Sequence, residues 1–175
     1  MILKLKRTPG IYLVGFMACG KSTIGRLLAD TLGWSFADID EEIERRTQRT
    51  ITEIFDLEGE EAFRRFEQEA IAARVRSIEC GRPTVVALGG GAFARPENYQ
   101  LVAANGVSIW LDCPLETLLK RIAGDTTRPL ARDLERFRQL YEARLPAYQR
   151  ADFRVSVTGD DPLAVVNQIL KLPIF

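Results

Sequence analysis

A glycine-rich loop between an apolar run and a helical pattern constrains this chain more than any other feature. The apolar run Ile11–Val14 is typical of a buried strand. Residues Gly15–Ser22 then read GFMACGKS, which fits the pattern G-x-x-x-x-G-K-[ST], and apolar residues follow at helical spacing. A strand, a loop of this pattern and a helix together form the phosphate-binding P-loop unit. The alternative, a helix N-terminus that carries Gly-Lys-Ser by coincidence, leaves both flanks unexplained.

The residue types in this loop match what binding of a nucleoside triphosphate requires. Loop N–H groups surround phosphate oxygens, glycines permit their close approach, and the next helix directs its partly positive N-terminus at the same anion. Lys21 is expected to reach the β- and γ-phosphates, and the Ser22 hydroxyl is expected to ligate Mg²⁺. We therefore predict that ATP is bound by Gly15, Ala18, Cys19, Gly20, Lys21, Ser22 and Thr23.

Composition and charge exclude several functional classes. The 24 acidic and 24 basic residues balance, so we expect no nucleic-acid partner and no membrane partner. The chain has no histidine, so a general base has to be a carboxylate, lysine, tyrosine or cysteine. Its three cysteines show no metal-site spacing, which fits a reducing cytoplasm. We expect one domain, residues 1–175, acting as a monomer in the cytoplasm.

Short apolar runs alternate with helical patterns along the whole chain. This alternation predicts an α/β fold in three layers, with a parallel five-stranded sheet covered by helices on both faces. For a P-loop protein of this type we expect the strand order 2-3-1-4-5. The predicted strands are Ile11–Val14, Trp34–Asp38, Thr84–Leu88, Val107–Leu111 and Phe153–Val157. The predicted helices are Lys21–Leu32, Glu41–Arg46, Ile51–Glu58, Glu60–Ile78, Pro96–Ala104, Leu115–Ala123, Asp133–Tyr148 and Pro162–Lys171.

Two aspartates close the second predicted strand, Asp38 and Asp40. Ligands of open α/β sheets gather at the carboxyl ends of strands, and residues two apart face the same way if the strand continues. The pair suits one Mg²⁺ contact, from Asp38, and one proton acceptor. The alternative is an aspartate that caps the next helix.

Three further features are candidates for ligand contacts. Arg64 and Arg65 lie early in a long helix, where a charge pair usually forms a solvated face. Gly89–Gly91 follow the third strand, where many P-loop proteins carry a metal-binding aspartate, and they let backbone lie against a ligand or form a plain loop. The stretch 124–134 contains Arg128 and breaks the helical pattern, so we predict a mobile lid there.

These residues together resemble the shikimate kinase family. The resemblance covers essentially the whole chain and rests on GFMACGKST, Asp38-Ile-Asp40, Phe63-Arg-Arg-Phe-Glu67, Gly89–Gly91 and Arg128-Pro-Leu130. It implies phosphorylation of the shikimate 3-hydroxyl by ATP with Mg²⁺, a step toward chorismate and the aromatic amino acids. It further implies that residues about 40–67 form the substrate-binding helices.

The resemblance also implies individual roles. Asp40 binds the substrate hydroxyls and is the candidate base, with Lys21 and Arg128 as its catalytic partners. Arg121 stacks on adenine, and Arg64 and Arg144 bind the substrate carboxylate. The remaining substrate contacts are Ile51, Phe55, Phe63, Gly89, Gly90, Gly91, Pro129 and Leu130. Two departures are Ala18, where many relatives have glycine, and a somewhat shorter segment between Arg128 and Arg144.

Two rival functions and one reactive group stay open at this point. Another small-molecule kinase of the same fold, of gluconate or nucleotide type, would share the P-loop, and so would a non-catalytic nucleotide-binding module. Cys19 lies in the phosphate cradle near Lys21 and the helix N-terminus, so we expect its thiol to be alkylated faster than Cys80 and Cys113. The alternative is that Cys19 is an inert filler.

Overall fold

A parallel sheet of five strands, in the order β2-β3-β1-β4-β5, forms the centre of this computed structural model. The structure describes residues 10–124 and 133–175. All four neighbouring strand pairs are parallel, as predicted, and the predicted strand order is confirmed. The strands are β1 (Gly10–Val14), β2 (Ser35–Asp38), β3 (Thr84–Ala87), β4 (Val107–Asp112) and β5 (Phe153–Ser156).

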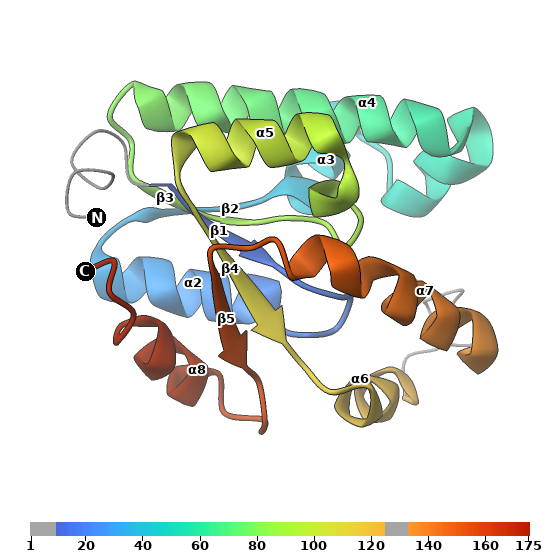
Figure 1. Ribbon diagram of the computed structural model, residues 1–175. Helices are drawn as coiled ribbons and strands as arrows, with labels where there is room; N and C mark the ends of the chain where they lie inside the picture. The colour runs from blue at the N-terminus through green and yellow to red at the C-terminus, as the bar shows by residue number, and fades with distance from the viewer. Residues whose placement is uncertain (1–9, 125–132) are drawn as a thin grey trace.

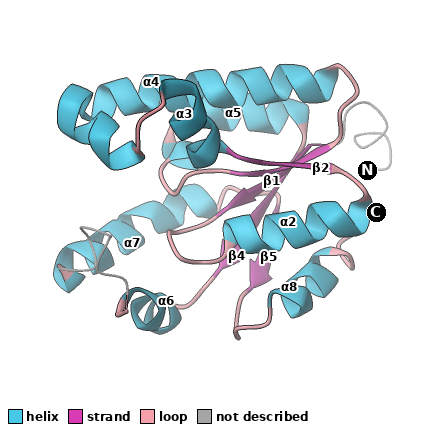
Figure 2. Cartoon of the chain, turned by 180° about the vertical axis from the view of Figure 1, so that it is seen from behind, coloured by secondary structure: helices cyan, strands magenta, loops and turns pink. Residues whose placement is uncertain are grey.

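Helices cover both faces of the sheet (Figures 1 and 2). They are α2 (Lys21–Leu32), α3 (Ile39–Thr47), α4 (Ile51–Glu79), the 3₁₀ turn η1 (Ala92–Ala94), α5 (Pro96–Asn105), α6 (Leu115–Ile122), α7 (Leu134–Tyr148) and α8 (Pro162–Ile169). Helices α4 and α5 lie along one face and α2 and α8 along the other, while α6 and α7 lie toward the carboxyl ends of the strands (Figure 1). Within the described residues no helix is long and apolar enough to cross a membrane.

Local signals explain where most helices begin and end. Gly33 adopts the left-handed conformation after α2, and its N–H closes on the carbonyls of Ala29 and Asp30. Thr50 and Glu53 form a reciprocal capping box at the start of α4. Gly59 has a φ of 83° and a ψ of 175°, so the predicted break there is confirmed as a kink within one long helical span.

The capping box gives a stability prediction. Thr50→Ala removes the hydroxyl that accepts the Glu53 N–H, so we expect the free energy of unfolding to fall by about 1 kcal/mol. Thr50→Ser keeps that acceptor and should retain most of the stability. Chemical denaturation of both variants measures the difference, and equal stability of the alanine and serine variants would contradict the assignment.

The structure corrects the prediction for the segment after β2. Asp38 is the last residue of the strand, and α3 begins at Ile39 rather than at Glu41. Asp40 therefore lies in the first turn of a helix, so the two aspartates do not share one face of a continued strand. The cause is Asp38 itself, whose Oδ1 accepts the N–H groups of Asp40 (2.9 Å) and Glu41 (3.2 Å) and so starts the helix.

The core lies on both faces of the three central strands. All five residues of β1 and all four of β3 are buried. Parallel strands covered on both faces read as continuous apolar runs, which is the pattern that the sequence shows here. The carboxyl ends of β1, β2 and β3 consequently meet at one edge, where the P-loop, Asp38 and Gly89–Gly91 lie.

Candidate active site

The P-loop connects β1 to α2, and its carbonyl groups hydrogen-bond to the side chain of its own lysine, Lys21. Gly20 has a φ of 99°, which lets the chain turn directly into the first residue of α2, Lys21. Lys21 Nζ donates to the carbonyl oxygens of Gly15 (2.8 Å) and Phe16 (3.0 Å). The side chain of Thr23 is exposed in the first turn of α2. The ammonium group therefore lies inside the loop, beside the helix N-terminus that favours an anion.

Ala18 adopts a left-handed backbone conformation, which only glycine adopts without strain. Its φ is 65°, in the left-handed region, which costs an alanine roughly 1–2 kcal/mol. Arg121 Nη1 donates to the Ala18 carbonyl oxygen at 2.9 Å. The hydrogen bond from α6 holds this strained position, so the loop keeps its shape with an alanine there.

Cys19 is fully buried within the loop. Its Sγ lies 3.8 Å from Lys21 Nζ and 2.8 Å from the place where a Cβ on Gly15 would be. A thiol that is 0% exposed is not open to a small alkylating reagent in this conformation. Cys113 is also buried, whereas Cys80 is exposed. The expected order of reactivity is therefore wrong for this conformation, and Cys19 acts as filler of the cradle.

Ser22 and Asp38 meet between α2 and the end of β2. The Ser22 hydroxyl donates to Asp38 Oδ2, while Asp38 Oδ1 caps α3. The alternative role of Asp38 as a helix cap is therefore confirmed on Oδ1, while its Oδ2 faces the Ser22 hydroxyl. One hydroxyl and one carboxylate suit Mg²⁺, which keeps several waters and binds substrate phosphates. Across residues 10–124 and 133–175 no group of three His, Cys, Asp or Glu side chains lies close enough together to hold a metal ion.

Asp40 places one oxygen in a buried position where none of the described residues forms a hydrogen bond with it. This atom, Oδ1, lies 3.0 Å from where a Cβ on Gly89 would be. Desolvation, and then the negative charges of Asp38 and Glu67, raise the pKa of Asp40 to about 6, although Lys21 acts in the opposite direction. A carboxylate with a pKa near neutrality can accept a proton late in a reaction and release it afterwards.

Glu67 completes the acidic side of the site, and the sequence analysis assigned it no separate role. It is 0% exposed, and its Oε1 accepts from Arg64 Nη1 at 2.8 Å. Its other oxygen has no hydrogen-bond partner within the described part of the chain and lies 2.8 Å from the same Cβ position on Gly89. Burial raises the pKa of Glu67, although the Arg64 guanidinium opposes this shift. The signal was present in the sequence as the Glu three residues after Arg64 on one helix face.

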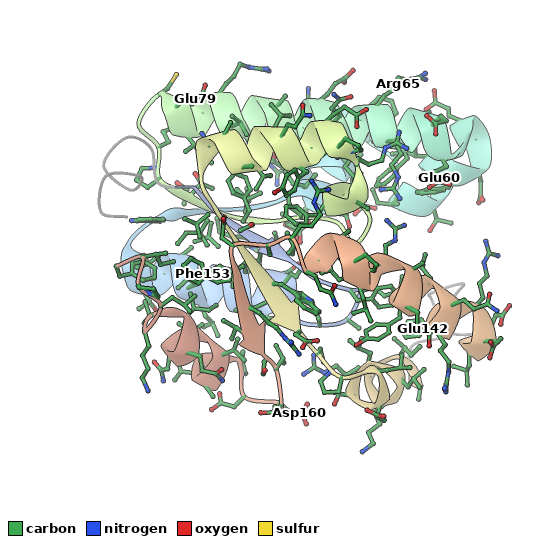
Figure 3. All side chains as sticks on the ribbon, viewed as in Figure 1. Glu60, Arg65, Glu79, Glu142, Phe153 and Asp160 are labelled. Atoms are coloured by element: carbon green, nitrogen blue, oxygen red, sulfur yellow. The ribbon has the colours of Figure 1, made fainter. Side chains whose placement is uncertain are left out.

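Two guanidinium groups from distant helices converge over Gly91. A Cβ on Gly91 would lie 2.6 Å from Nη2 of Arg64, on α4, and 2.6 Å from Nη1 of Arg144, on α7. Only a glycine leaves these groups room to stand so close to the backbone. Two arginines on one spot favour a bound carboxylate, because their planar donors match its geometry. Arg64 belongs to this site, whereas its neighbour Arg65 is exposed on the outer side of α4, as Figure 3 shows.

Two phenylalanines lie beside the Arg64 guanidinium, and Arg121 lies beside the P-loop. The Phe55 and Phe63 rings pack with centroids 4.8 Å apart and planes tilted by 35°, and the Arg64 guanidinium lies over Phe63. Ile51 is partly buried against the core. On the P-loop side, Arg121 Nη2 donates to the Gly159 carbonyl (3.3 Å) and pairs with Asp160, which Figure 3 labels in the turn between β5 and α8.

Three residues predicted for the site cannot be placed in it, and one residue that was not predicted contacts it. Arg128, Pro129 and Leu130 lie outside the described residues, as does most of the predicted lid 124–134. Tyr148 was not predicted as a site residue, but its hydroxyl donates to the Gly90 carbonyl at 2.6 Å. No sequence motif indicated this contact, because it joins residues 58 positions apart.

Comparison with known proteins matches this arrangement to one family. The family model described as Shikimate kinase matches residues 17–172. The shikimate kinase of Persephonella marina is 45% identical over 161 residues, which is 91% of this chain and 96% of that protein. That identity and coverage are sufficient to define the family, independently of the motifs.

Solved structures agree with this match. Shikimate kinase from Acinetobacter baumannii, in complex with shikimate, superposes with a TM-score of 0.87 at 34% identity, over 98% of this chain and 96% of that one. Shikimate kinase from Aquifex aeolicus gives 0.81 at 36% identity, over 92% and 94%. A gluconokinase from Sinorhizobium meliloti gives only 0.55 at 18% identity, over 94% and 90%, and so shares the fold alone. The chain therefore belongs to the shikimate kinase family.

Proposed function

We propose that this chain transfers the γ-phosphoryl group of ATP to the 3-hydroxyl of shikimate, giving shikimate 3-phosphate and ADP. One observation carries the proposal: two guanidinium groups converge over Gly91 on the same glycine segment whose first residue faces Asp40. A ring that bears a carboxylate and hydroxyl groups fits between such a clamp and such a base. The solved relative from Acinetobacter baumannii, whose structure holds shikimate, supports this choice of acceptor.

The reaction needs positioning and charge neutralisation more than covalent chemistry. Phosphoryl transfer passes through a loose transition state, so the acceptor proton leaves late and a carboxylate of modest basicity suffices. Asp40 lies beside Gly89 and accepts that proton while it orients the hydroxyl. Lys21 and the loop amides hold the phosphates as negative charge moves toward the leaving group.

Mg²⁺ belongs beside Ser22 and Asp38, whose hydroxyl and carboxylate already face each other. When bound, the ion supplies charge neutralisation at the phosphates. Arg121 donates hydrogen bonds to the Ala18 carbonyl of the P-loop and to the Gly159 carbonyl. This position suits a guanidinium that stacks on the adenine ring of ATP. Arg128 is the proposed lid arginine at the phosphates, and Pro129 and Leu130 join Phe55 and Phe63 as ring contacts.

The remaining assignments follow from the same proposal. Residues about 40–67 form the substrate-binding helices and about 124–134 the lid of a single domain, residues 1–175. We place the protein in the cytoplasm as a monomer that acts on ATP and shikimate, with Mg²⁺ as the cofactor and without nucleic-acid or membrane partners. We further propose that this phosphorylation is a step toward chorismate and the aromatic amino acids.

The carboxylate clamp gives a quantitative expectation. Arg64→Ala and Arg144→Ala should each weaken shikimate binding by about 2–5 kcal/mol, because each change leaves a buried carboxylate short of a charged partner. Affinity for ATP should change far less. Isothermal titration with each ligand measures both effects. Arg65→Ala is the matched control, since Arg65 is the exposed neighbour on the same helix. An equal loss of affinity for the two ligands would show that the clamp is misassigned.

A substrate panel tests the function itself. ADP release is followed with shikimate, quinate, gluconate and nucleoside monophosphates as acceptors, each with MgATP. We expect the highest kcat/KM with shikimate. A preference for gluconate would replace the proposal with a sugar-acid kinase of the same fold. Tight ATP binding without turnover of any acceptor would indicate a nucleotide-binding module instead.

A further inference from the structure

The segment Gly89–Gly91, here called the glycine strap, has to hold its position without side chains of its own. Three consecutive glycines have wide conformational freedom, and ordering them costs more entropy than ordering other residues. Yet the strap faces Asp40 at one end and the guanidinium pair at the other. Among the described residues, Leu88, just before the strap, donates its N–H to Leu13 O (3.1 Å), and the first strap carbonyl, Gly89 O, accepts the N–H of Ala92 (3.1 Å).

Tyr148 supplies the contact at the centre of the strap. Its hydroxyl donates to the Gly90 carbonyl at 2.6 Å, and the residue is 1% exposed. Burial raises the pKa of Tyr148, so the phenol remains a donor at any physiological pH. The ring itself packs against Trp110 of β4, with centroids 6.1 Å apart. The direction of the hydroxyl is therefore set by the sheet.

The same short stretch of α7 carries an arginine of the clamp. Arg144 lies four residues before Tyr148, which puts the two side chains on neighbouring positions of one helix face. Pro146 stands between them and has no N–H, so the last turn of α7 lacks one helical hydrogen bond. The hydrogen bond from Tyr148 to the strap ties this turn to the sheet edge. In Figure 1 this C-terminal end of α7 lies against the sheet, while its N-terminal end reaches away from it.

The strap in turn rests on the P-loop. A Cβ on Gly90 would lie 3.7 Å from Met17 N and 3.8 Å from both Gly15 O and the Tyr148 hydroxyl. One hydroxyl group thus lies where α7, the strap and the P-loop meet. We infer that Tyr148 is a positioning residue, which fixes the strap and Arg144 as one unit and thereby aligns shikimate with the phosphates. This inference rests on the proposed function.

Tyr148→Phe tests the inference, because it keeps the ring and removes only the hydroxyl. Loss of one buried hydrogen bond that orders the shikimate side should raise KM for shikimate about three- to tenfold. KM for ATP should stay unchanged, since the P-loop is held by its own lysine and by Arg121. In the absence of any ligand, hydrogen–deuterium exchange of a peptide covering residues 88–95 should become faster.

Tyr12→Phe is the matched control. Tyr12 is 0% exposed, and its hydroxyl donates to Asn105 Oδ1 at 2.5 Å, remote from the strap. The Tyr12→Phe substitution should lower the melting temperature much as Tyr148→Phe does. The KM for shikimate and the hydrogen–deuterium exchange of the strap should stay at wild-type values. If Tyr148→Phe lowers only the melting temperature, as the control does, Tyr148 is merely structural and the inference is overturned.

The exchange measurement separates this inference from the proposed function. If the wild-type protein does not phosphorylate shikimate, the proposed function fails and the alignment of shikimate fails with it. Faster exchange of the strap in Tyr148→Phe would then still show that the hydroxyl orders this segment. If wild type is active but exchange and KM are both unaffected, only the role of Tyr148 is refuted.

Discussion

Lys21→Met is expected to lower kcat by at least about a hundredfold, the scale of losing one preorganised donor at a developing charge. Methionine has nearly the length of lysine but no charge, so the substitution keeps a side chain of similar size in the loop and removes only the ammonium group. In the structure that ammonium already stands between the carbonyls of Gly15 and Phe16, inside the phosphate cradle. Steady-state kinetics with saturating MgATP and shikimate measures the loss.

Lys171→Met serves as the control for this substitution. Lys171 is exposed at the C-terminal end of the chain and should leave turnover unchanged. Thermal unfolding of both variants checks that the fold is retained. Near-normal turnover of a folded Lys21→Met protein would show that Lys21 does not act on the phosphates and would remove the central element of the mechanism.

Asp40→Asn is expected to abolish most phosphoryl transfer, by about 10²–10⁴-fold, which is the usual contribution of a positioned general base. Asparagine matches the shape of aspartate and can still accept a hydrogen bond, but it cannot take up the proton of the acceptor hydroxyl. ATP binding should remain close to that of wild type, because Asp40 faces Gly89 and the acceptor side of the site. Single-turnover kinetics and titration with ATP separate the two effects.

Asp38→Asn provides the contrast to Asp40→Asn. Asparagine remains a good N-cap, so α3 should still start at the same place. The change removes the negative charge beside the Ser22 hydroxyl, and the concentration of Mg²⁺ needed for half-maximal rate should rise. If Asp40→Asn instead weakened only ATP while shikimate turnover persisted, the roles of the two aspartates would be reversed.

The features that sequence reasoning identified correctly depend on residues that are close together in the chain. The P-loop needs a strand, a glycine loop and a helix in direct succession. The start of α4 needs only Thr50 and Glu53, and its kink needs only Gly59. Each of these signals is complete within a few residues, so no knowledge of distant contacts is required. The strand order, in contrast, came from a general expectation for P-loop proteins, and the structure agrees with it.

Tertiary packing decided how distant residues meet in the site. Arg64 and Arg144 converge on Gly91, Glu67 and Asp40 both face Gly89, and Tyr148 reaches Gly90. These contacts depend on the register between helices and strands far apart in the chain, which no local pattern encodes. Packing also overturned a local argument at Cys19: its place in the phosphate cradle predicted an accessible, fast-reacting thiol, but the folded loop buries it completely. The sequence alone thus predicts most of the groups in the proposed site, and the packing of α4 and α7 around the strap determines what each of them faces.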